Sequence, residues 1–275
     1  IEMIKMHGLG NDFVIINDLS GGIQAEHDLA VLARKICHRR FGVGADGIIL
    51  IGASDDHDFK FRIYNSDGSS AQMCGNGMRC VARYLYDQKI IPTTSMTMDT
   101  LAGTVIPEVV TDDQGRFSGV RVDMGIPQLS CRNIPFICDD EKAVEETLAA
   151  GDEEILVTTV SMGNPHAVIF VDDIDGVDIS KTGPAVENHE RFPEKTNVEF
   201  IEVISPSELR MRVWERGAGI TLACGTGACA ALVAANLTGR SGDRAVVHLD
   251  GGDLDLVWDK ESGHIFKTGP AEYVF

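Results

Sequence analysis

Two short boxes in the chain place a cysteine directly before a Gly-x-Gly turn. The first is Cys74-Gly75-Asn76-Gly77 and the second is Cys224-Gly225-Thr226-Gly227. Each leads into a helical run, residues 78–86 and 228–237, so each thiol is expected at a helix N-terminus. Unpaired amides and the helix dipole there favour anions and lower a thiol pKa from about 8.5 toward roughly 3.5–7.5. One such box would usually be a buried cysteine, but two at equivalent positions indicate a function.

Opposed helix-tip thiols are suited to proton transfer at one carbon. If a carboxylate binds the amides of both helix tips, the carbon next to it lies between the two sulfurs. One thiolate can then remove the α-proton of an amino acid while the opposite thiol protonates the other face, which inverts the configuration. The amides also stabilise the carboxylate as it gains enolate character. The boxes therefore predict a two-base racemase or epimerase.

The boxes belong to an internal repeat whose offset is 224 − 74 = 150 residues. Residues 61–80 align with 211–230 without a gap, and this register pairs Arg62 with Arg212 and Tyr64 with Trp214. Gly10-Asn11 matches Gly163-Asn164 at nearly the same offset. A repeat this long predicts two homologous lobes related by a pseudo-twofold axis, with the active site in the cleft between them.

The lobes are expected to combine short strands with a few helices. Strands are predicted at residues 3–6, 13–17, 47–51 and 59–64, and helices at 26–39 and 78–86. Residues 139–152 could form a short capped helix. We assign residues 1–118 with 264–275 to the N-terminal lobe and 119–263 to the C-terminal lobe. A polar connection is expected within 111–118 or 139–154.

The composition is that of a core-forming protein with an acidic surface. The 275 residues include 24 Lys+Arg and 42 Asp+Glu, a net charge of −18, and 44% of them are hydrophobic. Such a charge argues against nucleic acid and anionic membranes as partners, because both would repel it. The apolar run at 228–237 is about half of the roughly 20 residues that span a bilayer, and no leader is evident near Ile1. Seven cysteines, an odd number, favour free thiols and a reducing, cytoplasmic location.

Four segments also resemble the diaminopimelate epimerase family. They are MHGLGNDFV at Met6, YNSDGSSAQMCGNGMRC at Tyr64, SMGNPHAV at Ser161 and ERGAGITLACGTGACA at Glu215, and the resemblance runs nearly end to end. It implies an α+β fold in which each lobe is a mixed, barrel-like β-sheet wrapped around a central helix. The implied activity is interconversion of LL- and meso-diaminopimelate, for lysine and peptidoglycan precursors, without cofactor or metal. A homodimer is one candidate assembly.

The resemblance also assigns roles to individual residues. Cys74 and Cys224 match the family's catalytic pair, and the backbone amides of Gly75-Asn76 and Gly225-Thr226 its carboxylate cradle. Recognition near the reacting centre falls on Asn65 and Glu215. Recognition of the distal end of the substrate falls on Asn11, Asn164, Asn197 and Arg216. His166 and Glu215 are expected to help set the thiol protonation states. Gly47 stands where some members carry a substrate-contacting Gln, so that contact is missing here.

Other interpretations of the same residues remain open. Asn11 and Asn164 follow glycines and could simply shape turns, and Glu215–Arg216 could be a charge pair at a strand end. Cys80 and Cys229 are expected to be buried side chains, since the cysteine spacings do not fit a zinc site. GLGNDF lacks the spacing of a nicotinamide site. Competing functions are another amino-acid racemase of the same superfamily and a dithiol redox or ligand-binding protein.

Overall fold

The chain divides into two compact units. The structure, a computed structural model, describes residues 1–150 and 153–275. Unit 1 comprises Ile1–Asp123 and Thr268–Phe275, and unit 2 comprises Met124–Lys267. The expected boundaries, after residues 118 and 263, lie a few residues before these divisions. The prediction of a polar connection was wrong, because residues 111–118 close a β-hairpin inside unit 1 and the segment from 139 lies inside unit 2.

Unit 1 contains a mixed sheet with the strand order β19-β1-β2-β3-β4-β6-β7, with β5 paired to β4. The pairs β2–β3 and β4–β6 are parallel, and the hairpin β8–β9 is antiparallel. The strands are β1 (Ile4–Gly8), β2 (Asn11–Asp18), β3 (Gly47–Gly52), β4 (Phe59–Asn65), β5 (Ser70–Ala71), β6 (Met98–Thr100), β7 (Gly103–Val105), β8 (Glu108–Thr111), β9 (Phe117–Asp123) and β19 (Glu272–Tyr273). The helices are α1 (Gly22–Glu26), α2 (Leu29–Cys37) and α3 (Gly75–Asp87).

Unit 2 has the strand order β10-β11-β12-β13-β14-β16-β17, with β15 paired to β14. Its parallel pairs are β12–β13 and β14–β16. The strands are β10 (Glu146–Ala150), β11 (Glu153–Ser161), β12 (Pro165–Phe170), β13 (Asn197–Ser205), β14 (Glu208–Glu215), β15 (Gly219–Thr221), β16 (Arg244–Leu249) and β17 (Gly252–Trp258). The helices are the 3-10 turn η1 (Cys131–Asn133), α4 (Ile179–Glu187) and α5 (Gly225–Leu237). Strand β18 (Ile265–Gly269) contains the division between the units.

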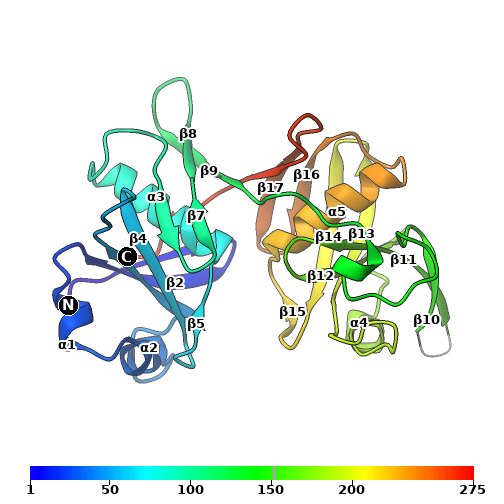
Figure 1. Cartoon of the computed structure of the whole chain (residues 1–275), viewed down its shortest axis with the longest axis horizontal. Helices are drawn as coiled ribbons and strands as arrows, with labels where there is room; N and C mark the ends of the chain where they lie inside the picture. The colour runs from blue at the N-terminus through cyan, green and yellow to red at the C-terminus, as the bar shows by residue number, and fades with distance from the viewer. Residues whose placement is uncertain (151–152) are drawn as a thin grey trace. The chain divides into compact units, whose positions relative to one another are not determined.

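The two units repeat one topology, as the sequence repeat predicts. In each, a helix separates the first parallel pair of strands, α2 between β2 and β3 and α4 between β12 and β13. A second helix, α3 or α5, follows the short strand β5 or β15 and precedes the second parallel partner. Each of these second helices lies at the centre of its own unit (Figure 1). The α+β class and the central helix expected for each lobe are confirmed.

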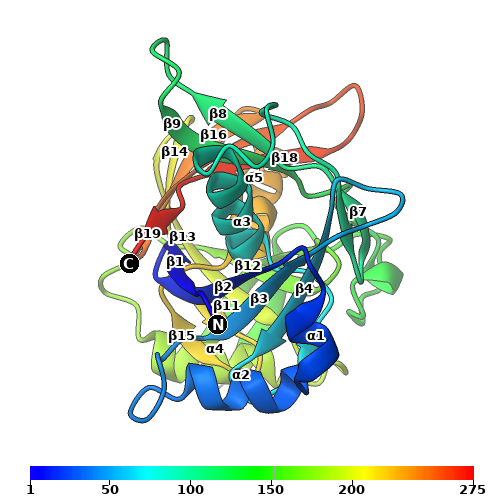
Figure 2. The same ribbon diagram turned by 90° about the vertical axis from the view of Figure 1, so that its left-hand side faces the viewer.

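Apolar side chains on both faces of β2 and β3 explain this layering. Val14 and Ile48 pack in a cluster with α2, whereas Phe13 and Ile49 face Gly77 of α3. Helices α2 and α3 therefore cover opposite faces of the sheet (Figure 2). Helix α5 is buried along most of its length and contacts strands β11–β14, β16 and β17. Of the helices that the structure describes, none is both long and apolar enough to cross a membrane.

Several element boundaries differ from those predicted. Helix α2 begins at Leu29 rather than Glu26, because the carboxylate of Asp28 accepts a hydrogen bond from the amide of Val31 and caps the helix there. Residues 22–26 form the separate helix α1. Helix α3 begins at Gly75 and α5 at Gly225, since the glycines of the boxes take part in the first turn although they carry no apolar signal.

The predicted helix at residues 139–152 is wrong. Residues 146–150 form β10, which pairs antiparallel with β11 from Glu146–Val157 to Ala150–Glu153. Leu148 and Ala150 alternate with exposed residues along this strand, so the segment has the period of a half-buried strand. Residues 151 and 152 lie outside the described part of the chain.

Candidate active site

Cys74 lies at the tip of α3, as predicted, and is half-buried. It is the N-cap residue of the helix, with an extended backbone at φ −140° and ψ 117°. Its Sγ is 3.6 Å from Oδ1 of Asn11, and Nδ2 of Asn76 donates a hydrogen bond to the same oxygen over 3.2 Å. The fold thus brings together three predicted site residues that come from the β1–β2 turn and the first box.

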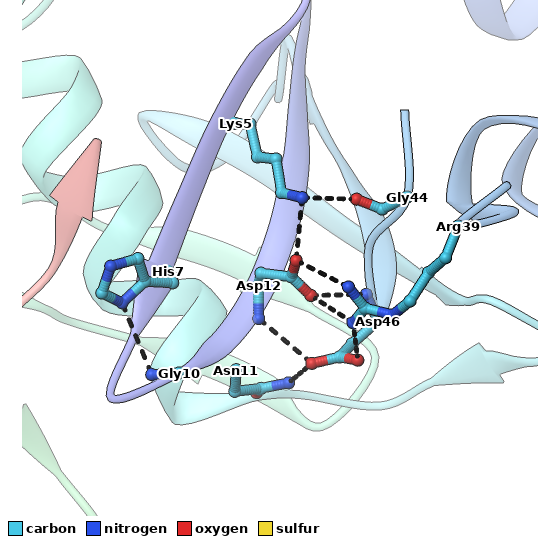
Figure 3. Close-up of polar contacts among 8 residues, drawn as sticks. All are labelled: Lys5, His7, Gly10, Asn11, Asp12, Arg39, Gly44 and Asp46. Carbon is cyan, nitrogen blue, oxygen red and sulfur yellow. Dashed lines mark hydrogen bonds and ion pairs between the residues drawn. The ribbon is translucent and has the colours of Figure 1, made fainter. Parts of the chain in front are cut away.

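The side chain of Asn11 is anchored on its other side by a charged network (Figure 3). Nδ2 of Asn11 donates to Oδ2 of Asp46 over 2.8 Å, and Arg39 bonds both Asp46 and Asp12. Lys5 forms an ion pair with Asp12 at 2.9 Å. Burial raises the pKa of Asp12, but hydrogen bonds from Arg39 and Lys5 outweigh it and hold this pKa below its usual value.

A buried cation, Arg79, backs the tip of α3. Its side chain is 0% exposed, Nε donates to the carbonyl of Pro270 over 2.9 Å, and Nη1 lies 3.5 Å from the carbonyl of Gly75. Its Nη2 makes no hydrogen bond within the described part of the chain, and burial lowers its pKa. A Cβ built on Gly8 would lie 2.9 Å from Nη2, so the β1–β2 turn passes directly over the guanidinium. Arg79 was not predicted as a site residue, because in the sequence it looks like an ordinary residue of a helix.

Cys224 lies at the tip of α5 with the same extended backbone but is only 5% exposed. Its sulfur accepts from the amide of Gly227 over 3.4 Å and lies 3.6 Å from Oγ1 of Thr226. Burial, and then the negative charges of Glu215 and Glu199, raise the pKa of this thiol. The helix-tip placement is confirmed, whereas the expected lowering of the pKa is wrong for Cys224 because burial outweighs the helix dipole.

His166 connects an unpredicted buried acid to the second box. Its Nδ1 is 2.6 Å from Oε1 of Glu199, and its Nε2 is 3.0 Å from Oδ1 of Asn164. Nδ2 of Asn164 donates to Thr226 over 3.4 Å, which completes a polar chain from the acid to the neighbour of Cys224. A carboxylate only accepts hydrogen bonds, so Nδ1 of His166 carries a proton. Both His166 and Glu199 are 0% exposed.

Glu199 could have been noticed in the sequence as an acid placed between the apolar residues Val198 and Phe200. Its Oε2 has no hydrogen-bond partner among the described residues. A Cβ built on Gly227 would lie 2.6 Å from its Oε1 and 3.2 Å from the sulfur of Cys224. The last glycine of the box therefore lets a buried carboxylate approach the thiol.

A second buried cation lies at the tip of α5. Lys267 is 1% exposed, and a Cβ built on Gly225 would lie 2.3 Å from its Nζ. Arg79 and Lys267 thus occupy comparable places against Gly75 and Gly225, although one comes from the helix and the other from β18. Positive charge behind each helix tip adds to the attraction that the amides exert on an anion.

Asn197, Glu215 and Arg216 lie at neighbouring strand ends in unit 2. Asn197 donates from Nδ2 to the carbonyl of Pro165 over 2.8 Å and accepts at Oδ1 from the amide of Arg216 over 2.9 Å. Its side chain therefore links three segments of the site. Glu215 accepts a hydrogen bond from the hydroxyl of Thr221, and burial raises its pKa.

Two predicted recognition residues are more open. The exposed side chain of Arg216 donates from Nη1 to the carbonyl of Glu194 over 3.0 Å, so the rest of its guanidinium can serve other acceptors. Asn65, at the end of β4, donates to the hydroxyl of Ser69 over 2.9 Å.

The remaining cysteines separate into two kinds. Cys80 and Cys229 are buried inside α3 and α5, where burial raises their pKa to about 12 and about 11. Cys131 and Cys138 form a disulfide, so the expectation of free thiols is wrong for these two cysteines. The two cysteines are separated by seven positions, and the turn η1 between them brings the chain back on itself. The described residues contain no group of three or more His, Cys, Asp or Glu arranged to hold a metal ion.

The sequence and fold match known proteins along the whole chain. The family model described as diaminopimelate epimerase matches residues 3–130 and 158–274. Diaminopimelate epimerase of Desulforapulum autotrophicum is 54% identical over 275 residues, covering 100% of this chain and 97% of that one. That of Moorella thermoacetica is 50% identical, with 100% and 98% covered.

Solved structures share the fold at low identity. A phenazine biosynthesis protein of the PhzF family from Bacillus anthracis has a TM-score of 0.73 at 16% identity, covering 100% of this chain and 98% of that one. A hydroxyproline epimerase from Agrobacterium vitis has a TM-score of 0.66 at 18% identity, covering 99% and 90%. The family model and the relatives at about half identity together show that the chain is an isomerase and belongs to the diaminopimelate epimerase family.

Proposed function

We propose that this protein interconverts LL- and meso-2,6-diaminopimelate by two-base catalysis with Cys74 and Cys224, without a cofactor. The observation that carries the proposal is the pair of cysteines that cap α3 and α5, each at the start of a helix with open amides. Membership of the diaminopimelate epimerase family also supports the proposal. Such an activity needs one acid and one base, and the two boxes supply one each.

In the proposed mechanism, the amides of Gly75-Asn76 and Gly225-Thr226 bind the carboxylate next to the reacting carbon. As the α-proton leaves, negative charge develops on this carboxylate, and the amides stabilise it. Burial and two acids raise the pKa of Cys224. We therefore propose that Cys224 is protonated in the free enzyme and that Cys74 removes the α-proton first. The roles reverse in the opposite direction of reaction.

The remaining site residues are proposed to recognise the substrate. Asn65 and Glu215 would bind near the reacting centre, where the carboxylate of Glu215 suits an ammonium group. Asn11, Asn164, Asn197 and Arg216 would bind the distal amino-acid end, where Arg216 can hold a carboxylate with two parallel hydrogen bonds. His166, together with Glu215, would help set the protonation of the thiols. Recognition at both ends distinguishes this substrate from simpler amino acids.

We also propose a cellular setting for this activity. A net charge of −18 supports a small-molecule substrate rather than a nucleic acid. The family supports a cytoplasmic role in making lysine and peptidoglycan precursors, and a homodimer is the assembly we would test first, by light scattering.

The test is incubation with LL-diaminopimelate in deuterated water without added cofactor. We expect the inverted product to carry deuterium at the α-carbon. Cys74→Ala and Cys224→Ala should each reduce the rate at least ~100-fold, because loss of a positioned acid or base costs about 10² to 10⁴. Cys80→Ala and Cys229→Ala are matched controls that should stay active.

Each alternative gives a different result in this experiment. Deuterium in another amino acid but not in diaminopimelate would favour a racemase of different specificity. No exchange with any amino acid would favour a dithiol redox or binding protein. If either Cys74→Ala or Cys224→Ala remained as active as its control, the two-base mechanism would be wrong.

A further inference from the structure

The amide of Asn11 has chemically different ends, and the end that faces Cys74 decides what this part of the site can bind. We propose that Asp46 is a positioning residue that holds Asn11 with its carbonyl oxygen toward Cys74, where this oxygen can accept a hydrogen bond from an ammonium group of the substrate. The inference rests on the proposed function and adds to it a residue outside the two boxes.

The orientation follows from the chemistry of Asp46. A carboxylate oxygen only accepts hydrogen bonds, so the atom of Asn11 that lies 2.8 Å from Oδ2 of Asp46 must be the amide nitrogen. The oxygen of Asn11 is therefore the atom near the sulfur of Cys74, at 3.6 Å. The same oxygen also accepts from Nδ2 of Asn76 over 3.2 Å.

Asp46 is itself held on both sides (Figure 3). Its Oδ2 also accepts from the amide of Asp12 over 3.1 Å, and its Oδ1 accepts from Nη2 of Arg39 over 2.8 Å. Its own amide donates to Oδ1 of Asp12 over 3.0 Å and to the carbonyl of Asp12 over 2.9 Å, so several hydrogen bonds link the segment before β3 to the start of β2. Besides Asp12 and Arg39, the charged groups near this pair are Lys5, bonded to Asp12, and Arg79, on the helix that Cys74 caps.

The second repeat contains a different arrangement at the equivalent asparagine. Oδ1 of Asn164 lies 3.0 Å from Nε2 of His166, and its nitrogen donates to Thr226 of the second box. Asn11 thus presents oxygen toward its box, whereas Asn164 presents nitrogen toward its box. Only the first orientation is fixed by its partner, because the carboxylate of Asp46 only accepts, whereas a ring nitrogen of His166 can donate or accept.

An oxygen that faces the site has a clear consequence. An ammonium group only donates hydrogen bonds, so the oxygen of Asn11 can accept from it, while a reversed amide would offer a second donor. A reversed amide would also donate to the sulfur of Cys74 and favour its thiolate. Loss of the acceptor at position 46 should therefore weaken substrate binding and make Cys74 react at lower pH.

Three variants separate this role from the others that Asp46 could have. Asp46→Ala removes the acceptor, Asp46→Asn removes only the negative charge and keeps one acceptor oxygen, and Arg39→Met removes the ion pair without touching Asn11. The readouts are KM and kcat for diaminopimelate, and the pH profile of iodoacetamide alkylation at Cys74 followed by peptide mapping.

We expect Asp46→Ala to raise KM about threefold to tenfold, the size of one lost hydrogen bond, with a smaller change in kcat. Its alkylation profile should move to lower pH. Asp46→Asn should restore most of both properties, and Arg39→Met, which leaves the bond from Asn11 to Asp46 in place, should be less impaired than Asp46→Ala. The proposal is overturned if Asp46→Ala matches the wild type within twofold, or if Asp46→Asn is as impaired as Asp46→Ala, which would make the charge alone responsible.

Two further measurements keep the test decisive. If Asp46→Ala does not fold, exchange of the side-chain amide protons of Asn11 is measured by NMR in the unmodified protein. Exchange as fast as in free asparagine would contradict the bond to Asp46, and slower exchange would support it. If the wild type does not turn over diaminopimelate, the proposed function fails, while the alkylation profiles still decide whether Asp46 orients Asn11.

Discussion

Glu199 places a carboxylate in the core of unit 2, directly behind Cys224. One of its oxygens is bonded to His166, and the other has no partner among the described residues. Burial of an acid whose oxygen has no hydrogen-bond partner lowers the free energy of unfolding, unless the histidine compensates the charge. The same carboxylate is one of the two that raise the pKa of Cys224. Stability and thiol chemistry are therefore linked at this residue.

Glu199→Gln should lower the pKa of Cys224, because burial and Glu215 would remain but one negative charge near the sulfur would be gone. Alkylation of Cys224 should then begin at lower pH, and kcat/KM should fall at least about tenfold as His166 loses its charged partner. The matched control is Glu202→Gln, on the same strand, whose carboxylate accepts from the amide of Ile174 instead. An unchanged alkylation profile in Glu199→Gln would show that Glu199 does not influence the pKa of Cys224.

At the scale of elements, the two central helices begin alike but differ in what lies against the last glycine of each box. A Cβ on Gly77 would meet the terminal methyl of Ile49 at 2.6 Å. A Cβ on Gly227 would meet the carboxylate of Glu199 at the same distance. A methyl group at the end of a flexible side chain can move aside, whereas a buried carboxylate held by His166 cannot do so without breaking that bond.

Gly77→Ala and Gly227→Ala therefore form a matched pair of substitutions. Gly77→Ala should change the free energy of unfolding little, because the gain of ~0.5–1 kcal/mol from replacing a helical glycine offsets the small displacement of Ile49. Gly227→Ala should lose about 1–3 kcal/mol and most of the activity. Urea unfolding and steady-state kinetics measure both. Equal behaviour of the two variants would show that the packing of Glu199 against α5 is unimportant.

Across the whole molecule, burial of thiols links stability to pH. Burial raises the pKa of Cys37 and Cys229 from 9.0 to about 11, and that of Cys80 to about 12. In the unfolded chain these thiols would release their protons near pH 9, while the folded protein still retains them. Because the unfolded state then binds fewer protons, raising the pH favours unfolding.

We therefore expect the free energy of unfolding to fall from about pH 9 upward, through the folded-state values of about 11 and 12. The limiting slope is ~1.4 kcal/mol per pH unit for each thiol. Urea midpoints measured between pH 7.5 and 10.5 test this, with Cys229→Ala as the variant in which the slope should be shallower. A midpoint that stays constant or rises over this range would contradict the buried, protonated state of these cysteines.

Some features of the fold and site were predictable because their signals are local. The short segments 47–51 and 59–64, which are rich in β-branched or aromatic residues and bounded by Gly, Asn and Asp, predict strands that the structure contains as β3 and β4. The helix tips at Cys74 and Cys224 follow from a box that repeats with its surroundings. The helix expected at 139–152 failed because its charged residues conceal the strand period of Leu148 and Ala150.

The sequence by itself determined the repeat, the two helix-tip cysteines and the chemistry that such a pair supports, since these depend on residues close together in the chain. Only the tertiary structure decided which end of Asn11 faces Cys74, that Glu199 and Lys267 approach the second box, and that burial raises the pKa of Cys224. The physical reason is that desolvation and charge act through space. They depend on groups such as Asp46 and Glu199, which lie far from the boxes in sequence and leave no mark on the spacing that identifies the cysteines.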